Sequence, residues 1–343
     1  MKPNPVTMRD VAKAAGVSRM TVSRALRKDS PVSDETRQRI LQVVRDMNYV
    51  PDQMAGSLST KRSGFVAVLV PSLNNLHFAE TVQALTEALA PSGRQILLGH
   101  TGYSAEREEA LIEEMLRRRP EAIVLSYDGH TDRTLDLLGD ARVPVVELWE
   151  TPEEPICHTV GFSNLTAARA MTDSLIAQGY RNIAFLGEAK DDWTRGAARR
   201  SGYLESMQAK GLSAHRCLQY GSPPLSIEDG AAAVGLLLAR FPDTDCIFCV
   251  SDAPAFGAMS RLRERGIDVP EHIGIAGFGN FEVSRFSQPA ISTVVVDPIR
   301  IGQETGHLIA GCLDEASTLT GTVKIRVPAE VSLRDSTRTR FLD

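Results

Sequence analysis

The chain has 343 residues, of which 43% are hydrophobic and 24% are charged, with a formal net charge of −5. Such a composition is typical of a globular protein with roughly two or three domains. The sequence contains no apolar run of about 18 residues and begins with polar residues, so it predicts neither a membrane span nor a secretory signal. Five scattered cysteines fit a reducing, cytoplasmic setting better than a disulfide framework.

The charge is divided unevenly along the sequence. Residues 1–62 contain 12 Lys and Arg against 6 Asp and Glu, a net charge of +6, whereas the remaining residues contain 26 against 37, a net charge of −11. A basic head on an acidic body predicts that the head alone binds nucleic acid.

Residues 7–26 predict two short helices separated by a turn at Gly16. Thr7 can cap the first helix together with Asp10, which is close to a capping box, and Ser18 can cap the second. Glycine readily takes the left-handed conformation that such a tight turn requires. Helical spacing turns three apolar side chains of the second helix inward, namely Val22, Ala25 and Leu26. We therefore expect a helix-turn-helix that enters a DNA major groove, with an ordinary helical hairpin as the alternative.

A third helix is predicted to begin at the N-cap Ser33 and to run to about Asn48. Its apolar stripe has helical spacing and consists of Ile40, Val43, Val44 and Met47. Pro51 ends this unit, because the residue before a proline avoids the helical conformation. Residues 52–59 can form a helix that is too short to be stable alone in water, and residues 60–64 are predicted to be a linker.

From Phe65 onward, apolar runs alternate with amphipathic segments. The predicted strands are 65–70, 95–99, 122–126, 145–148, 182–186, 246–250, 273–277 and 292–296. The predicted helices are 76–90, 104–118, 164–178, 197–210, 227–240, 254–265 and 299–313. This alternation indicates an α/β fold with parallel sheets and right-handed crossovers. Because about 270 residues exceed what one such sheet usually holds, we expect two lobes with a ligand cleft at the carboxyl ends of the strands.

Cys246 and Cys249 form a C-x-x-C pattern inside an apolar run. Residues three apart in a strand point to opposite faces, so the two thiols are not expected to share a metal or a disulfide. We interpret them as core cysteines and expect no metal site in the chain.

Several motifs of the head occur together in one known family. They are Val-Thr-Met-Arg-Asp-Val-Ala (6–12), Ala-Gly-Val-Ser-x-x-Thr-Val-Ser-Arg (15–24), Val-Ser-x-x-Thr-Arg (32–37), Asn-Tyr-Val-Pro (48–51) and the hinge pattern Ala55…Leu58. The body adds Arg-x-x-Gly-Tyr (199–203), Ser-Asp-x-x-Ala-x-Gly-Ala (251–258) and Ile-x-Ile-Ala-Gly-Phe (273–278). On these motifs the chain resembles the lactose-repressor family of bacterial transcriptional regulators over nearly its whole length. Segments 18–24, 71–80, 143–148 and 160–164 further resemble the gluconate-repressor branch.

The resemblance implies a body of the two-lobed periplasmic-binding-protein type, with chain crossings between the lobes near residues 161, 290 and 320. The expected domains are a helix-turn-helix head (1–51), a hinge helix with linker (52–63), and an effector-binding and dimerisation domain (64–343).

The resemblance also implies DNA contacts on the second helix and in the hinge. Arg19 and Arg24 can bond guanine edges and Met20 can pack on a thymine methyl group, whereas serine and threonine side chains fit phosphate contacts. Leu58 is expected to enter the central minor groove and kink the site, with a contact to the body as the alternative. Asp52, where the family often has Asn, can cap the hinge helix but repels phosphates. The complete DNA-binding set is Thr7, Ser18, Arg19, Met20, Thr21, Ser23, Arg24, Ser33, Tyr49, Met54, Ala55 and Leu58.

In the body, Arg199 aligns with the arginine that the family uses to hold its small ligand, although a surface salt bridge is the alternative. Gly279 and Ser251 stand where many sugar-responsive members have Asp and Asn, and the loss of a carboxylate beside an arginine favours an anionic ligand. Trp149 can pack on a sugar or belong to the core. The expected effector-binding set is Ser72, Asn75, Phe78, Glu147, Trp149, Arg199, Ser251 and Asn280.

These features predict a homodimeric repressor of sugar-acid catabolism genes. It should bind a palindromic double-stranded operator and be released by a sugar acid such as gluconate, a keto-gluconate or 6-phosphogluconate. A neutral-sugar regulator, an activator and a sugar-acid-processing enzyme remain as alternatives. The seven histidines show no catalytic triad spacing or metal pair, so we expect neither enzymatic activity nor a cofactor.

Overall fold

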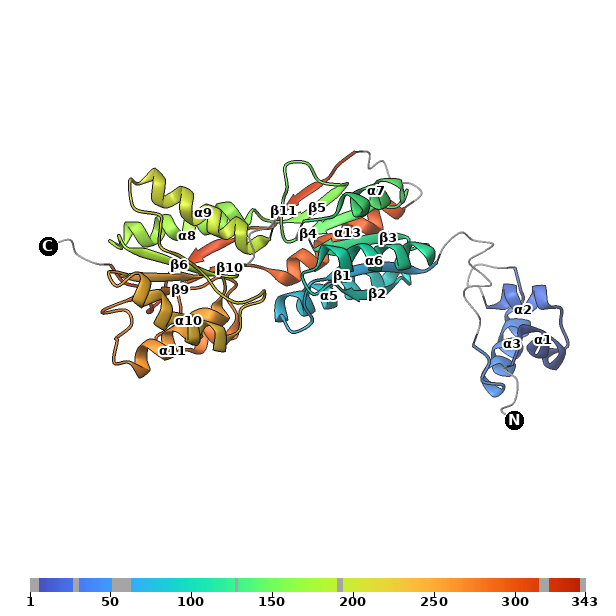
Figure 1. Ribbon diagram of the computed structural model, residues 1–343. Helices are drawn as coiled ribbons and strands as arrows, with labels where there is room; N and C mark the ends of the chain where they lie inside the picture. Colours follow the sequence, from blue (N-terminus) through green and yellow to red (C-terminus); the bar gives the residue numbers. More distant parts are fainter. Residues whose placement is uncertain are drawn as a thin grey trace. The chain divides into compact units, whose positions relative to one another are not determined.

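A computed structural model of the chain describes residues 6–26, 31–50, 63–126, 129–189, 194–314 and 321–339 (Figure 1). The chain divides into two compact units, Met1–Ser63 and Gly64–Asp343, and each is considered by itself. None of the helices in the described ranges is long and apolar enough to cross a membrane.

The described part of the first unit contains the helices α1 (Met8–Ala15), α2 (Arg19–Ala25) and α3 (Asp34–Asp46). The Asp10 carboxylate accepts hydrogen bonds from the backbone N–H and the hydroxyl group of Thr7, at 2.9 and 2.6 Å, which confirms the predicted capping box. Gly16 has a φ of 67°, and Ser18 Oγ accepts a hydrogen bond from the Thr21 backbone N–H at 3.1 Å. The three helices share a small apolar core that includes Val11, Val22 and Ile40.

One lobe of the second unit is built on a parallel sheet with the strand order β11-β5-β4-β3-β1-β2. The strands are β1 (Phe65–Val70), β2 (Gln95–His100), β3 (Ala122–Ser126), β4 (Val145–Leu148), β5 (His158–Gly161) and β11 (Lys324–Arg326). The helices are α5 (Leu76–Leu89), α6 (Ala105–Arg117), α7 (Asp132–Asp140) and α13 (Pro298–Leu313), with the 3-10 turn η1 (Ala90–Ser92) after α5. Val68 and Leu69 of β1 enter different core clusters, because successive side chains of a strand face opposite sides. This lobe is called lobe 1.

The other lobe, lobe 2, is built on a parallel sheet with the order β7-β6-β8-β9. The strands are β6 (Ile183–Gly187), β7 (Cys217–Gln219), β8 (Cys246–Cys249) and β9 (Gly274–Ala276). The helices are α8 (Asn164–Ala177), α9 (Arg195–Ala209), α10 (Ile227–Arg240), α11 (Asp252–Glu264) and α12 (Glu282–Phe286). The short strands β10 (Thr293–Val295) and β12 (Glu330–Ser332) pair with each other in antiparallel orientation.

The chain passes between the lobes three times within the described residues. It leaves lobe 1 after β5, returns after β10 to form α13, and leaves again between β11 and β12. These passages lie close to the expected positions near residues 161, 290 and 320, and the expected two-lobed α/β architecture is confirmed.

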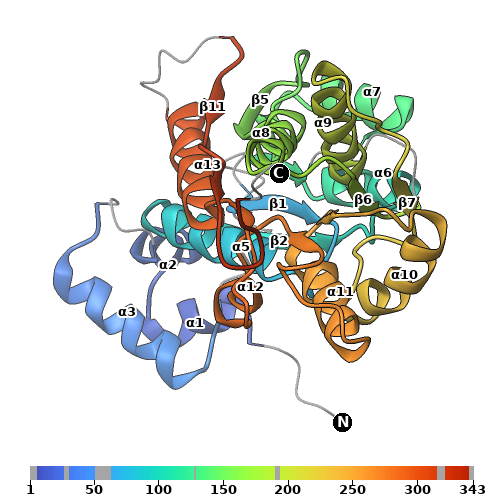
Figure 2. The ribbon, with the colours of Figure 1, turned by 90° about the vertical axis from the view of Figure 1, so that its left-hand side faces the viewer.

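Two helices of lobe 1 pack closely together because one of them has a glycine at the point of contact. Helices α5 and α13 lie side by side (Figure 2). A Cβ atom at Gly302 of α13 would come within 2.3 Å of the Thr81 carbonyl oxygen in α5, so only glycine permits this spacing.

The two cysteines of the C-x-x-C pattern lie in the core, as predicted. Both Cys246 and Cys249 are fully buried, but they belong to core clusters on opposite faces of the lobe 2 sheet. The alternation of side chains along β8 therefore separates the two thiols.

Every strand and helix predicted from residue 65 onward is present, with ends shifted by at most two residues. In the part of the chain that the structure describes, the sequence pattern did not reveal seven short elements, which are η1, α7, α12, β5, β7, β11 and β12.

Candidate nucleic-acid interface and ligand pocket

Helix α2 presents one polar, positively charged face to solvent. Arg19, Met20 and Arg24 are exposed. The exposed fraction of Met20 is 64%, although methionine is apolar and is usually buried. Val22 and Ala25, on the opposite face, are buried in the head. The half-buried hydroxyl side chains of Thr21 and Ser23 border the exposed face. An exposed basic face held by an apolar one is the arrangement that major-groove recognition requires.

Three other predicted DNA-binding residues are helix N-caps. Thr7, Ser18 and Ser33 begin α1, α2 and α3, and each is exposed. Their position leaves them at positively polarised helix ends, where phosphate oxygens bind readily.

The remaining predicted DNA-binding residues lie elsewhere. Tyr49 packs into the core of the head and has an exposed fraction of only 8%. The hinge residues Met54, Ala55 and Leu58 lie outside the described residues, as does Asp52.

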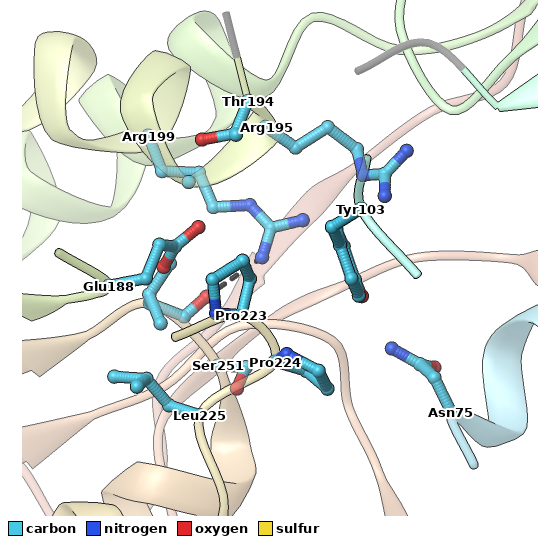
Figure 3. A pocket seen from close by; sticks show the side chains of 12 residues that line it. Asn75, Tyr103, Glu188, Thr194, Arg195, Arg199, Pro223, Pro224, Leu225 and Ser251 are labelled. Carbon is cyan, nitrogen blue, oxygen red and sulfur yellow. Dashed lines mark hydrogen bonds between the residues drawn. The ribbon is translucent and has the colours of Figure 1, made fainter. Parts of the chain in front are cut away.

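The second unit contains a pocket between its two lobes, with about 480 Å³ of space including the solvent at its mouth (Figure 3). Asn75 and Tyr103 line it from lobe 1, after the carboxyl ends of β1 and β2. From lobe 2, Glu188 follows β6 and Ser251 follows β8. The other residues of the wall are Thr194, Arg195, Gly196, Arg199, Pro223, Pro224, Leu225 and Val250. A pocket therefore lies at the carboxyl ends of the strands, where the sequence predicts the ligand cleft.

Arg199 is held in a fixed orientation at one wall. Its Nε donates a hydrogen bond to Asn164 Oδ1 at 2.9 Å, and its Nη1 donates to the Val250 carbonyl oxygen at 2.8 Å. The guanidinium carbon lies 3.7 Å from the centre of the Phe278 ring, in a cation–π contact. Burial, together with the positive charge of Arg195, lowers the pKa of Arg199 to about 10, so the group remains cationic at neutral pH.

Arg195 is a second arginine of the wall, one helical turn before Arg199, and it is buried, with an exposed fraction of 7%. Its Nη1 donates a hydrogen bond to Ser126 Oγ at the end of β3, and its guanidinium carbon lies 5.1 Å from the centre of the Phe78 ring in α5. Both partners belong to lobe 1, whereas Arg195 begins α9 of lobe 2. This side chain therefore spans the cleft and connects the two lobes.

Glu188 brings one negative charge to the same wall and has an exposed fraction of 8%. Its carboxylate lies against the first turn of α9, where a Cβ atom at Gly196 would come within 1.7 Å of Oε1. Thr194 caps this helix by accepting a hydrogen bond from the Ala197 backbone N–H at 3.0 Å. The carboxylate thus stands at the positively polarised end of α9.

Of the predicted effector-binding residues, the structure brings Asn75, Arg199 and Ser251 together in the pocket. Ser72 and Phe78 are buried close by and do not line it, although Phe78 supports Arg195.

Glu147, Trp149 and Asn280 also lie outside the pocket wall. Glu147 accepts a hydrogen bond from the Ile156 backbone N–H at 2.7 Å, deep in lobe 1. Trp149 packs in the core, with its ring 5.7 Å from the ring of His77. Asn280 Oδ1 accepts a hydrogen bond from the Arg334 guanidinium.

Sequence reasoning missed Tyr103, Glu188 and Arg195, which contribute much of the polarity of the wall. Arg195 was visible only as a neighbour of Arg199. A basic residue one turn before a ligand-binding arginine faces the same side of a helix, and that spacing is the signal that could have identified it.

A second buried charged cluster lies inside lobe 1. His130 Nδ1 lies 2.5 Å from Glu108 Oε1, and Nε2 lies 3.8 Å from Glu147 Oε1. Burial alone would lower the pKa of His130, but the hydrogen bonding and negative charges of Glu108 and Glu147 outweigh it and raise the pKa to about 9. The imidazole is therefore charged at neutral pH and compensates part of the charge of the two carboxylates.

Comparison with known proteins identifies the family. Residues 7–52 match the family described as bacterial regulatory proteins, lacI family, and residues 172–337 match the periplasmic binding protein-like domain. The HTH-type transcriptional regulators GntR and IdnR of Escherichia coli (strain K12) are each 33% identical to this chain; the match to GntR covers 88% of this chain and 90% of GntR, and the match to IdnR covers 90% and 92%. The chain belongs to the LacI family of transcriptional regulators.

A solved structure extends this assignment. A LacI-family transcriptional regulator from Silicibacter pomeroyi is 58% identical, with a TM-score of 0.77, and the match covers 81% of this chain and 100% of that one. The protein is therefore a DNA-binding transcriptional regulator and not an enzyme, and its head is a LacI-type helix-turn-helix.

Proposed function

We propose that this LacI-family regulator represses genes of sugar-acid catabolism and is released from its operator by a small sugar acid. Gluconate, a keto-gluconate and 6-phosphogluconate are the candidate effectors. The observation that carries the proposal is that two arginines line one pocket, Arg195, which is buried, and Arg199, which is half-buried and cationic. A forked guanidinium suits a carboxylate, which it can bind through two parallel hydrogen bonds.

The loop that follows β9 in lobe 2 also supports an acid over a neutral sugar. Gly279 has a φ of 128°, and a Cβ atom there would lie 2.7 Å from the Phe281 ring and 2.9 Å from His77. The rings of His77 and Phe281 stack 3.9 Å apart, so they occupy the space that a side chain at position 279 would need. An aspartate at this position, which would accept bonds from the hydroxyl groups of a neutral sugar, would therefore strain the backbone and force these rings to shift.

We further propose that the protein binds a palindromic operator as a homodimer. A two-fold axis presents two copies of α2 to two half-sites, so the symmetry of the operator follows that of the protein. Arg19, Met20 and Arg24 would contact base edges, and Leu58 of the hinge would enter the central minor groove.

The pocket suggests how the effector signal reaches the head. A ligand that touches Asn75 and Tyr103 on one side and Arg199 on the other favours a closed cleft, because it contacts both lobes only in that state. Closure would move the first lobes of the dimer relative to each other and unfold the hinge segment 52–59. A difference in effector affinity of a few kcal/mol between the two states is enough for the switch.

The proposal is tested with the full-length protein and an operator selected from random duplexes. We expect selection to yield a palindrome, and a sugar acid to weaken its binding at least tenfold in a gel-shift titration. Glucose and glucitol, as neutral controls, should leave binding unchanged. Release by a neutral sugar alone, or no preference for any palindrome, would contradict the proposal.

A further inference from the structure

We propose that one edge of lobe 1 is a second DNA-binding surface, which holds phosphate groups of the same duplex that the head reads. The edge consists of the amino-terminal ends of four adjacent strands, β4, β3, β1 and β2. We call it the basic edge after the arginines that lie on it, which are Arg94, Arg117, Arg118, Arg119 and Arg142. The inference requires only that the protein binds DNA and does not depend on the identity of the effector.

An arginine lies just before three of these four strands. Arg94 directly precedes β2, Arg119 lies three residues before β3, and Arg142 lies three residues before β4. The fourth strand, β1, is preceded in the sequence by Lys61 and Arg62. Because neighbouring strands lie about 4.8 Å apart, the four strand ends cover roughly 14 Å, a length comparable to several successive phosphate groups of one DNA strand.

Hydrogen bonds at the strand ends hold these loops side by side. The Glu121 backbone N–H donates to the Phe65 carbonyl oxygen, and the Ile123 N–H donates to the Pro144 carbonyl oxygen, both at 2.9 Å. The Glu121 carboxylate also accepts a hydrogen bond from the Gly64 backbone N–H at 2.7 Å. Since Gly64 begins the second unit, the basic edge is where the chain enters the body from the head.

This connection is what favours DNA as the partner. Twelve residues, 51–62, separate the described parts of the head and the body. Twelve residues can span at most about 40 Å, so a duplex bound by the head is within reach of the basic edge. The tether also keeps the local concentration of DNA phosphates at this edge high, which no free anion in solution would match.

The charge of the basic edge is opposite to that of the body as a whole. Its five arginines have three carboxylates within three residues in the sequence, namely Glu114, Glu121 and Asp140, so this set has a net charge of +2. Residues 63–343 together have a net charge of −11. The total charge predicts that the head alone binds nucleic acid, but it conceals a positive edge on the acidic body.

Two of these carboxylates are already paired with arginines of the edge. Glu121 Oε2 accepts a hydrogen bond from Arg94 Nε at 2.8 Å, and Glu114 lies 3.7 and 3.0 Å from the guanidinium nitrogens of Arg117 and Arg118. Glu113, one residue before, pairs with Arg133 of α7 at 3.4 Å instead.

Other carboxylates leave part of the positive charge uncompensated. Asp140 is exposed at the end of α7, and Glu87, one turn before the end of α5, accepts a hydrogen bond from Gln83 at 3.0 Å. Arg119 and Arg142 remain, and neither guanidinium makes a hydrogen bond or an ion pair with another residue of the described ranges. These two arginines are therefore the ones best placed to bind phosphate groups.

The backbone at these two arginines is of the kind that glycine usually provides. Arg119 and Arg142 are each the second residue after a helix, α6 and α7, with φ values of 54° and 51°. A side chain is disfavoured in this left-handed conformation, so glycine is the common residue at such helix ends. Both arginines are exposed, so packing does not explain them, whereas contact with an anionic partner does.

The inference is tested on the full-length protein by combining Arg119→Gly with Arg142→Gly. Glycine removes both charges and suits the left-handed backbone, so the variant should resist thermal unfolding at least as well as the wild type. Its affinity should fall at least tenfold at about 100 mM salt. The loss should be equal for the selected operator and for a random duplex of the same length, because phosphate contacts carry no base preference.

The salt dependence identifies the lost contacts as phosphate contacts. The slope of log affinity against log salt concentration should become shallower by about 2 for each chain that binds, since each phosphate contact releases about one counterion. Arg119→Lys combined with Arg142→Lys keeps the charge and should retain most of the affinity and the slope.

Two exposed arginines of lobe 2 provide the matched control. Arg169→Gln combined with Arg265→Gln removes the same charge from the body, on α8 and after α11. We expect both DNA affinities to stay within twofold of the wild type. An equal loss in this control would show that only the total charge of the body matters and would overturn the inference.

The remaining outcomes separate this inference from the proposed function. An unchanged affinity and salt slope in the folded glycine variant would show that the basic edge does not touch DNA. A loss for the operator with none for the random duplex would also contradict phosphate binding. If the wild-type protein prefers no palindrome, the proposed function is wrong, while the comparison on the random duplex still decides this inference.

Discussion

Two helices of this protein carry a pair of arginines close to a hydroxyl N-cap, and the pairs differ in burial. Helix α2 begins after Ser18 and exposes Arg19 and Arg24 to solvent. Helix α9 begins after Thr194 and buries Arg195 almost completely, with Arg199 fixed by two hydrogen bonds. The residue type is the same, so the surroundings decide the chemistry.

The difference explains why one pair suits a polymer and the other a small molecule. Exposed arginines keep their hydration and their freedom, which allows them to adjust to an extended, highly charged surface such as DNA. Arginines that are held in a pocket wall are already partly desolvated and fixed in one rotamer. Binding of a small anion therefore costs little further free energy of desolvation or side-chain ordering. Four predictions test the contrast.

The two pairs of arginines should differ most in how strongly the salt concentration changes the affinity for their ligands. If α2 and the hinge make about six or more phosphate contacts, operator affinity should fall about a thousandfold between 50 and 200 mM salt. Effector affinity should change less than roughly threefold, because buried charges are screened weakly. Fluorescence anisotropy measures operator affinity, and calorimetry measures effector affinity, at each salt concentration. An equal loss of both affinities with rising salt would contradict the proposed difference between the two pairs.

Arg199→Met should weaken sugar-acid binding by about 2–5 kcal/mol, or roughly thirtyfold to several thousandfold, because a charged partner held in the pocket wall is lost. Operator binding in the absence of effector should be unchanged, since the head is a separate unit. Arg199→Lys, which retains the charge, should lose less. A Met variant that binds the acid normally would show that Arg199 has no role in recognition.

His130 of lobe 1 is a third basic group, buried between carboxylates that belong to the protein itself. Its pKa is raised from 6.5 to about 9, so its stabilising effect is complete below pH 6.5 and is lost as the pH rises through 9. We expect the free energy of unfolding of the body to fall by about 3 kcal/mol across this range.

Urea unfolding at pH 6, 7.5 and 9.5 measures this dependence. His130→Asn should remove most of the slope, whatever its effect on stability at a single pH. An unchanged slope in the variant would assign the pH dependence to another group.

Arg24→Ala should weaken operator binding by about 1–3 kcal/mol and relax the base preference at one position of each half-site. Arg45→Ala, in the exposed last turn of α3, removes the same charge away from α2 and is the matched control. Measuring affinity for a set of single-base operator variants distinguishes the cases. Uniform weakening across all sequences would make Arg24 a phosphate contact instead.

The sequence pattern predicted the central strands because a buried strand consists mainly of apolar residues, which are easily recognised as a run. Strands β1 and β3 are continuous apolar runs, and their ends were predicted to the residue. Strands β11 and β12 were not predicted, because each has only three residues and most of them are polar or charged. Each forms a strand by pairing with a distant one, β11 with β5 and β12 with β10.

The site could be predicted only in part. Arg199 follows from its motif, but the burial of Arg195 depends on Ser126, which is 69 residues away in the sequence. Glu147 and Trp149 were candidates for the cleft because both lie at the end of a predicted strand, with the core as the alternative for Trp149. The backbone turns to a φ of 68° at Trp149, so that its side chain packs in the core cluster while Glu147 faces His130 on the other side of the sheet. Sequence periodicity carries no sign of such a turn.

The central claim is that the anion pocket and the DNA-binding head are coupled, and reciprocal binding tests it most directly. Gluconate affinity of the full-length protein is measured by calorimetry with and without saturating operator. We expect the operator to lower gluconate affinity by the same factor, at least tenfold, by which gluconate lowers operator affinity. Equal gluconate affinities in the presence and absence of operator would contradict the account.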